Sequence, residues 1–275
     1  MEDSPLPFLF EMGVATYYLF NGYTVQFVDL ERQDQQARSF DLLVQKADFV
    51  AEVECKRTGY DAGKPIHRDV FYRLCDEISK RIAKASGNWF VRLHFSDILP
   101  TNAVVHRQLA DELRKMIEQH VLVGHMDGVV MKIEELSSDL HFRTMADLDK
   151  LRNGDEHIAA LWSQDKTILI GARSSKEYKI VENLEARLKE AADQLSKRMP
   201  GCIWCYVEGI EDWEWQPLSA GFEGIAMIAL DHEDKNHVAV VSYVSEGHIR
   251  SFRGAAGTRY RVVRNQSDFV IPADF

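Results

Sequence analysis

Apolar residues recur at helical spacing near the start of the chain. Between Pro5 and Gly22 they fall on one stripe, which predicts an amphipathic helix that ends near Asn21-Gly22. The stripe consists of Phe8, Met12, Ala15, Leu19 and Gly22. The next segment, "YTVQFVDL", is rich in β-forming residues and predicts a strand.

Residues 40–57, "FDLLVQKADFVAEVECKR", are interpreted as a β-hairpin whose second strand carries Glu52, Glu54 and Lys56 in alternation. Successive side chains of a strand point to opposite faces of its sheet. One face of the second strand therefore carries only apolar residues and Cys55. The other face carries Glu52, Glu54 and Lys56 together.

The remaining pattern alternates helices and strands and indicates an α/β protein. Helices are expected at about 67–85 and 104–120, from a cap at Ser174 or Ser175 to Pro200-Gly201, and within 218–230. Strands are expected in "NWFVRLHF", "MDGVVMKIEEL", "TILIGA", "CIWCYVEG" and "HVAVVSYV", with a hairpin around "GAAG". No repeat or linker divides the sequence, so residues 1–275 are read as one α/β domain with soft boundaries.

Composition narrows the class of protein. A chain of 275 residues with 45% hydrophobic content can bury a substantial core. It has no apolar run of membrane-spanning length and no basic leader, so we expect a cytoplasmic protein without a membrane partner. Cys202 and Cys205 have zinc-like spacing, but a strand would point them to opposite faces, which favours core positions. The net charge of −10 argues against coating nucleic acid by bulk electrostatics.

The position of Asp41 depends on the hairpin turn. A two-residue loop at Ala47-Asp48 would place Asp41 opposite Glu54, with their Cβ atoms about 5 Å apart. A loop of odd length would send the two carboxylates to opposite faces. Paired carboxylates fit Mg²⁺, which prefers oxygen ligands. The same charges are also typical of a solvated strand face.

Asp41 followed by Glu54-Cys55-Lys56 resembles the signature of the PD-(D/E)XK nuclease superfamily, with Phe40 where the proline would stand. The resemblance implies a restriction endonuclease-like core, a mixed central sheet flanked by helices, here with additional strands and helices. It implies that Asp41, Glu54 and the backbone carbonyl of Cys55 bind Mg²⁺ or Mn²⁺ and that Lys56 assists the nucleophile. Glu11 on the first helix matches an acidic residue that such folds often supply, and Glu52 is a further supporting acid.

The function that this resemblance implies is metal-dependent hydrolysis of phosphodiester bonds, with DNA as the expected partner and substrate. The alternative is a catalytically inactive member of the same fold that binds nucleic acid or another protein. The sequence leaves the oligomeric state open, and a homodimer is compatible with it.

Two later segments could complete the core that residues 1–57 begin. In one arrangement the helix at 67–85 and the following strand continue it. In the other, residues 60–165 are an insertion and the core resumes within 166–275. The second arrangement would bring Gln194 towards the site, because some members of the superfamily carry a Gln or Lys on the corresponding helix.

Two basic segments are weaker candidates for phosphate contacts. The C-terminal one contains Arg250, Arg253, Arg259 and Arg261, together with Arg264. The other consists of Lys80, Arg81 and Lys84.

Overall fold

The computed structural model describes residues 6–28, 40–59, 61–83, 85–137, 147–148, 150–163, 166–210, 212–245, 260–264, 267, 269 and 271–272. Its contacts divide the chain into two compact units. Unit 1 comprises Met1–Gly63 and Lys179–Phe275, and unit 2 comprises Lys64–Tyr178. The α/β class is confirmed, and the sheet of each unit buries its own set of apolar side chains.

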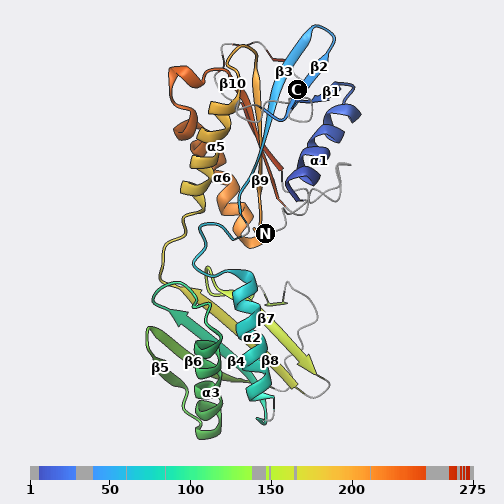
Figure 1. Ribbon diagram of the computed structural model, residues 1–275. Coiled ribbons are helices and arrows are strands. Elements are labelled where there is room, and N and C mark those ends of the chain that lie inside the picture. The colour runs from blue at the N-terminus through green and yellow to red at the C-terminus, as the bar shows by residue number, and fades with distance from the viewer. Residues whose placement is uncertain are drawn as a thin grey trace. The chain divides into compact units, whose positions relative to one another are not determined.

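Unit 1 is built on a six-stranded mixed sheet with the order β1-β2-β3-β9-β10-β11 (Figure 1). Strands β3, β9 and β10 run parallel, and the outer pairs are antiparallel. The strands are β1 (Thr24–Phe27), β2 (Leu42–Lys46), β3 (Phe49–Arg57), β9 (Gly201–Val207), β10 (Val238–Ser245) and β11 (Tyr260–Arg264). Every residue of β9 and β10 is buried, as expected for central parallel strands covered on both faces.

Helices cover both faces of this sheet. Helix α1 (Leu6–Phe20) lies on one face, and α5 (Ile180–Gln194) and α6 (Asp212–Leu230) lie on the other (Figure 1). A short 3₁₀ helix, η1 (Glu233–Lys235), precedes β10. The core under α1 joins side chains of the helix to Ala51 and Val53 of β3 and to Trp204 of β9.

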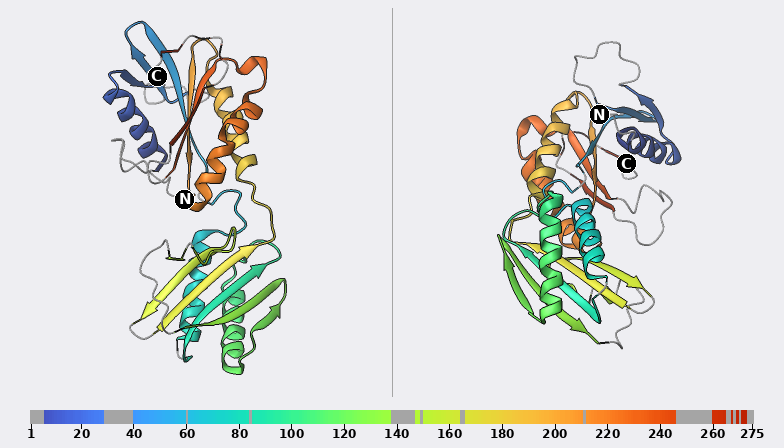
Figure 2. Two further views of the ribbon diagram at one scale, coloured as in Figure 1. Left: turned by 180° about the vertical axis from the view of Figure 1, so that it is seen from behind. Right: turned by 60° about the horizontal axis from the view of Figure 1, so that its bottom comes forward.

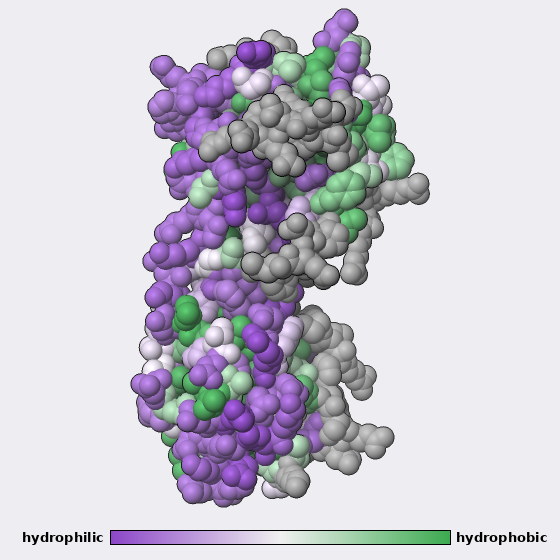
Figure 3. All heavy atoms as spheres, in the orientation of Figure 1, coloured by the Kyte–Doolittle hydropathy of each residue, from purple (hydrophilic) through white to green (hydrophobic). Residues whose placement is uncertain are grey.

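The face of α1 that packs on the sheet is not the predicted one. Phe8 and Leu19 of the predicted stripe are 49% and 57% exposed, and Met12 is exposed as well, whereas Phe10 and Val14 are buried. Hydrophobic residues accordingly stand at the surface over α1, in green in Figure 3. The helix is apolar on nearly all sides, so periodicity alone could not select the buried face.

A backbone contact joins the two segments of unit 1, which are separated in sequence by residues 64–178. The amide of Lys179 donates a 2.7 Å hydrogen bond to the carbonyl of Gly63. Gly63 has a positive φ of 81°, and a Cβ there would lie 2.6 Å from the Lys179 carbonyl carbon, so only glycine fits. Strand β9, which follows residues 64–178 in sequence, pairs in parallel with β3 in the sheet of unit 1.

Unit 2 contains a five-stranded mixed sheet with the order β5-β6-β4-β8-β7. Its elements are α2 (Arg68–Ile82), β4 (Asn88–Phe95), α3 (Ala103–Gln119), β5 (Val123–Met126), β6 (Val129–Leu136), β7 (His157–Ser163) and β8 (Lys166–Ser174). Helices α2 and α3 pack on one face of this sheet. In the left view of Figure 2 the strands lie in front of the two helices. On the other face, Leu148 packs against Phe90 and Leu169.

Several predicted boundaries differ from the structure. Helix α5 begins at Ile180, because the Ser174 hydroxyl instead donates to the Asp97 carbonyl and accepts the Lys176 amide. The segment predicted as one strand at 126–136 contains a turn at Asp127-Gly128, and β7 was not predicted. The hairpin around "GAAG" lies outside the described residues. No helix among the described residues combines the length and the apolar character needed to cross a membrane.

Candidate active site

The β2–β3 hairpin has the even-length turn. Lys46 pairs with Phe49 and Leu42 with Val53, so Ala47 and Asp48 form a two-residue loop. Ala47 adopts a positive φ of 53°, as the first position of such a tight turn requires. Continuing this register by one residue places Asp41 opposite Glu54.

Asp41 sits where β2 begins and binds the neighbouring strand through its side chain. The backbone amide of Cys55 donates a 2.6 Å hydrogen bond to Asp41 Oδ2. The amide of Asp41 in turn donates to the carbonyl of Val53 at 3.1 Å. The carboxylate thus takes the place of a strand carbonyl, and it is fixed beside the Glu54-Cys55-Lys56 segment.

Glu54 and Lys56 form a buried ion pair on the α5 face of the sheet. Lys56 Nζ lies 2.7 Å from Glu54 Oε1, and the two side chains are 13% and 2% exposed. From α5, the Gln194 Oε1 accepts a hydrogen bond from Lys56, and Glu190 Oε1 lies 3.5 Å from the same ammonium. Burial lowers the pKa of Lys56, but the charges of Glu54, Glu190 and Asp41 outweigh it and raise that pKa above its ordinary value. Lys56 is therefore an ammonium at neutral pH.

Glu52 shares the face of Glu54 but has a different set of partners. Its side chain is fully buried. The backbone amide of Ser196 donates a 2.6 Å hydrogen bond to Glu52 Oε2, and the Ser196 hydroxyl donates to Oε1. Glu52 therefore anchors the chain just after α5, two residues beyond Gln194. Its contacts indicate a positioning role.

Glu11 approaches from the other side of the sheet, because α1 packs on the face opposite α5. Cys55 lies between the two groups of acids. Burial raises the pKa of the Cys55 thiol, and the charges of Asp41, Glu54 and Glu11 raise it further. The three carboxylates predicted from the sequence therefore all act on this one thiol.

The donors at this place fit a hard divalent cation in their chemistry. Asp41, Glu54 and the carbonyl of Cys55 offer only oxygen atoms, which Mg²⁺ and Mn²⁺ prefer. In the structure, however, the charge next to Glu54 is the ammonium of Lys56. Within the part of the chain that the structure describes, no three His, Cys, Asp or Glu side chains come close enough together to hold a metal ion.

Most of the basic candidates cannot be placed, and those whose side chains are described are paired with acids. Arg250, Arg253 and Arg259 lie outside the described residues, and for Arg261 only the backbone, in β11, is described. Lys80 is neutralised by Asp76 and Glu77, and Arg81 lies 2.8 Å from Asp111. Lys84 lies outside the described residues.

Two residues at the site were not expected from the sequence: Glu190 and Ser196. Glu190 precedes Gln194 by one helical turn, and this spacing places both side chains on one face of α5. The spacing of four residues from Gln194 is therefore the sequence signal that indicates Glu190. Ser196 carried no comparable signal, because its contact with Glu52 spans 144 residues of sequence.

Comparison of the chain with protein-family models, curated proteins and solved structures found no match. A function for this site therefore has to be inferred from its own side chains.

Proposed function

We propose that the protein is a metal-dependent nuclease that hydrolyses phosphodiester bonds, with DNA as its substrate. The observation that carries the proposal is the pairing of Asp41 with Glu54 across the β2–β3 hairpin, beside the buried ammonium of Lys56. A solvent-exposed, charged strand face does not account for this arrangement, because Glu54 is almost fully buried. Buried charges are retained mostly where they are paired or functional.

The element order of unit 1 supports a restriction endonuclease-like core of the PD-(D/E)XK type. A helix precedes an antiparallel hairpin, and a second helix leads into a strand parallel to the last hairpin strand. Helix α5 also brings Gln194 to Lys56, where the resemblance predicts a polar side chain. Unit 2 is then an insertion between β3 and α5.

In this proposal Asp41, Glu54 and the Cys55 carbonyl bind Mg²⁺ or Mn²⁺. The ion supplies Lewis-acid activation of the scissile phosphate and of the attacking water. The Lys56 ammonium stabilises the negative charge that develops on the attacked phosphate. Gln194 and Glu190 orient this ammonium from α5, and Glu11 is a supporting acid. The four free cysteines in the described residues support a reducing, cytoplasmic setting.

A cleavage assay tests this proposal. Supercoiled plasmid and circular single-stranded DNA would be incubated with the protein and Mg²⁺ or Mn²⁺, with EDTA as the blank. We expect nicked or linear products that disappear in EDTA and in Asp41→Asn and Glu54→Gln variants. Matched controls are Asp48→Asn in the turn of the same hairpin and Glu182→Gln on the exposed start of α5, both of which should cut like the wild type. Failure of the wild type with either metal, or full activity of both site variants, would refute the proposal.

A second candidate function is a non-catalytic subunit that binds nucleic acid or another protein through the same fold. The ion pair between Lys56 and Glu54 favours it, because the buried carboxylate already has a cation from its own chain. Isothermal titration of the protein with Mn²⁺ distinguishes the two candidates. Binding that Asp41→Asn abolishes supports the nuclease, whereas no binding, together with no cleavage, supports the subunit.

A further inference from the structure

The net negative charge of the chain falls in unit 1. Residues 64–178 contain 17 Lys and Arg against 17 Asp and Glu, so unit 2 is neutral and unit 1 carries the whole net charge of −10. Seven of the ten histidines also lie in unit 2. Net negative charge weakens the attraction of a polyanion such as nucleic acid, so a surface that binds nucleic acid without a metal ion is better sought in the neutral unit 2.

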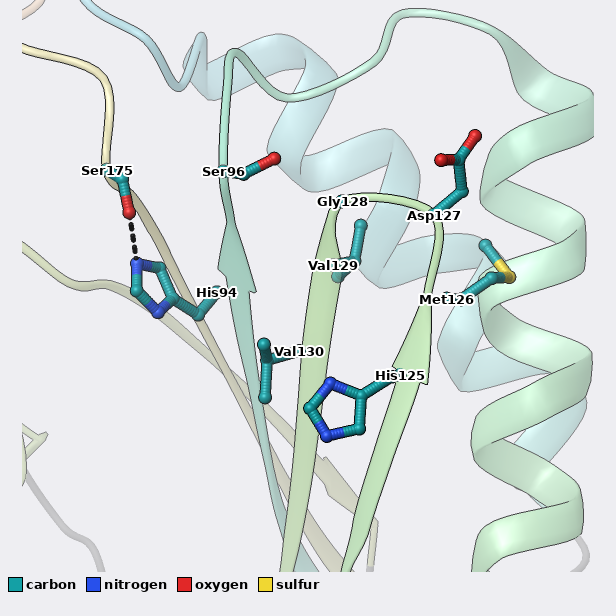
Figure 4. Close-up of a pocket in the computed structure, with 9 residues that line it drawn as sticks. All are labelled: His94, Ser96, His125, Met126, Asp127, Gly128, Val129, Val130 and Ser175. Carbon is teal, nitrogen blue, oxygen red and sulfur yellow. Dashed lines mark hydrogen bonds between the residues drawn. The ribbon is translucent and has the colours of Figure 1, made fainter.

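A pocket opens at one end of the unit 2 sheet, on the face opposite α2 and α3 (Figure 4). It has a volume of about 410 Å³. His94 of β4 and His125 of β5 flank Val130 of β6, and both histidines pair with Val130 in register. With strands about 4.8 Å apart, the two imidazoles stand on backbones roughly 10 Å apart. Ser96 and Ser175 contribute hydroxyl groups to the lining, and Asp127 contributes a carboxylate.

Two cations adjoin this pocket on the same face. Arg173 of β8 pairs with His94 in register, and Lys132 follows Val130 by two residues along β6. Neither cation forms an ion pair with any described residue. In the helices of unit 2, by contrast, Arg73, Lys80, Arg81 and Lys115 are paired with neighbouring acids, whereas Arg107 forms no ion pair with a described residue. This end of the sheet face therefore has two cations that are available to a bound anion.

His94 is the centre of this group. Its Nε2 lies 2.8 Å from the Ser175 hydroxyl, and the two share a hydrogen bond. Burial lowers the pKa of His94, and the nearby charges of Arg173 and Lys132 lower it further against the opposing effect of Asp155. Both cations thus act on the same imidazole. An anion placed there would be attracted by both cations and would favour protonation of His94.

We propose that the pocket lined by His94 and His125, together with the adjoining cations Lys132 and Arg173, binds single-stranded nucleic acid. The cations contact backbone phosphates, and the flat imidazoles on either side of Val130 provide stacking surfaces for bases. Charged grooves combined with flat rings are typical of single-strand binding. The site is independent of the proposed nuclease chemistry, because it lies wholly in unit 2 and needs no metal.

Fluorescence anisotropy with a labelled oligothymidylate 15-mer tests the proposal. The full chain would carry Asp41→Asn, and EDTA would be present, so that a failure of the nuclease proposal leaves the binding measurement unaffected. We expect the double variant Lys132→Ala/Arg173→Ala to bind about tenfold more weakly. The dependence of log K on log salt should also become shallower by about 1.4, since two phosphate contacts are lost.

The matched control is Arg107→Ala/Lys115→Ala, which removes the same charge from α3 on the other side of unit 2. It should bind like the parent chain, and Lys132→Arg/Arg173→Lys should restore most of the affinity. Circular dichroism melts check that each variant is folded. Equal losses in both double variants, or no loss in Lys132→Ala/Arg173→Ala, would overturn the proposal. Tighter binding of a duplex, or displacement of the oligonucleotide by millimolar inorganic phosphate alone, would overturn the assignment to a single strand.

Discussion

The carboxylate of Asp41 accepts a 2.6 Å hydrogen bond from the backbone amide of Cys55. Asp41 therefore stabilises the pairing of β2 with β3 in addition to its role in the proposed chemistry. The two roles separate by substitution, because an asparagine can accept the same hydrogen bond but cannot supply a negative charge.

Replacing Asp41 should therefore affect stability and cleavage differently. We expect Asp41→Ala to lower the free energy of unfolding by about 2 kcal/mol, because the Cys55 amide loses a charged acceptor. Asp41→Asn should cost about 1 kcal/mol or less. Both variants should fail to cut DNA. Urea unfolding followed by circular dichroism measures the difference, and equal losses in the two variants would contradict the assigned hydrogen bond.

Removal of the Lys56 ammonium should be strongly destabilising. Lys56→Met leaves the Glu54 carboxylate buried without its counterion, which costs about 3–5 kcal/mol. Replacing both partners, as Glu54→Leu/Lys56→Met, removes the buried charge and should recover most of that loss. The same urea titration applies. A double variant less stable than Lys56→Met would show that the ion pair is not the source of the effect.

Glu52 is expected to matter for structure more than for chemistry. Glu52→Gln turns an amide group towards one of the two Ser196 donors and should lower the free energy of unfolding by about 1–3 kcal/mol. Ser196→Ala, which removes only the hydroxyl, should cost about 1 kcal/mol. In the plasmid assay Glu52→Gln should keep measurable cleavage, whereas Glu54→Gln should not. Complete loss of cleavage in a well-folded Glu52→Gln variant would instead place Glu52 among the catalytic acids.

Two glycines should respond to alanine with opposite signs. A Cβ at Gly171 of β8 would clash with the buried Glu156 carboxylate, which is held by Arg92. Gly171→Ala should therefore destabilise unit 2 by about 1–3 kcal/mol. Gly221 lies in α6 with open space around it. Gly221→Ala should stabilise unit 1 by about 0.5–1 kcal/mol. Thermal melts monitored by circular dichroism report both effects.

The pKa of His94 predicts how stability depends on pH. Burial and the charges of Arg173 and Lys132 lower this pKa in the folded protein. Just below the ordinary value of about 6.5, the unfolded chain binds more protons at this position than the folded one. The free energy of unfolding should therefore fall as the pH drops through this window, and His94→Gln should flatten that slope. An unchanged slope in a folded His94→Gln variant would contradict the assignment to His94.

Local features of the site could be predicted from the sequence because they depend on strand alternation. Once the two-residue turn is assumed, Asp41 necessarily faces Glu54. The side chains that α5 brings to the site could not be derived in that way. Gln194 came from the resemblance alone, and Ser196 reaches Glu52 only through the complete fold.

The limits of the fold prediction have equally physical causes. Helix α1 is apolar on nearly all sides, so Phe8 looked as suitable for burial as Phe10. In sequence, both α2–β4 and α5–β9 are an amphipathic helix followed by a mainly apolar strand, so the pattern does not distinguish them. Only strand pairing, a long-range interaction, decides that β9 and not β4 lies beside β3.

The contact between Gly63 and Lys179 couples the folding rate of unit 1 to the folding of unit 2. To pair β9 with β3, unit 1 must close a loop that contains the whole of Lys64–Tyr178. For an unstructured loop of that length the entropic cost is about 4 kcal/mol. A unit 2 that folds early brings the ends of this loop together before β9 arrives. We therefore expect Gly171→Ala, which weakens only unit 2, to slow the refolding of unit 1 in stopped-flow experiments.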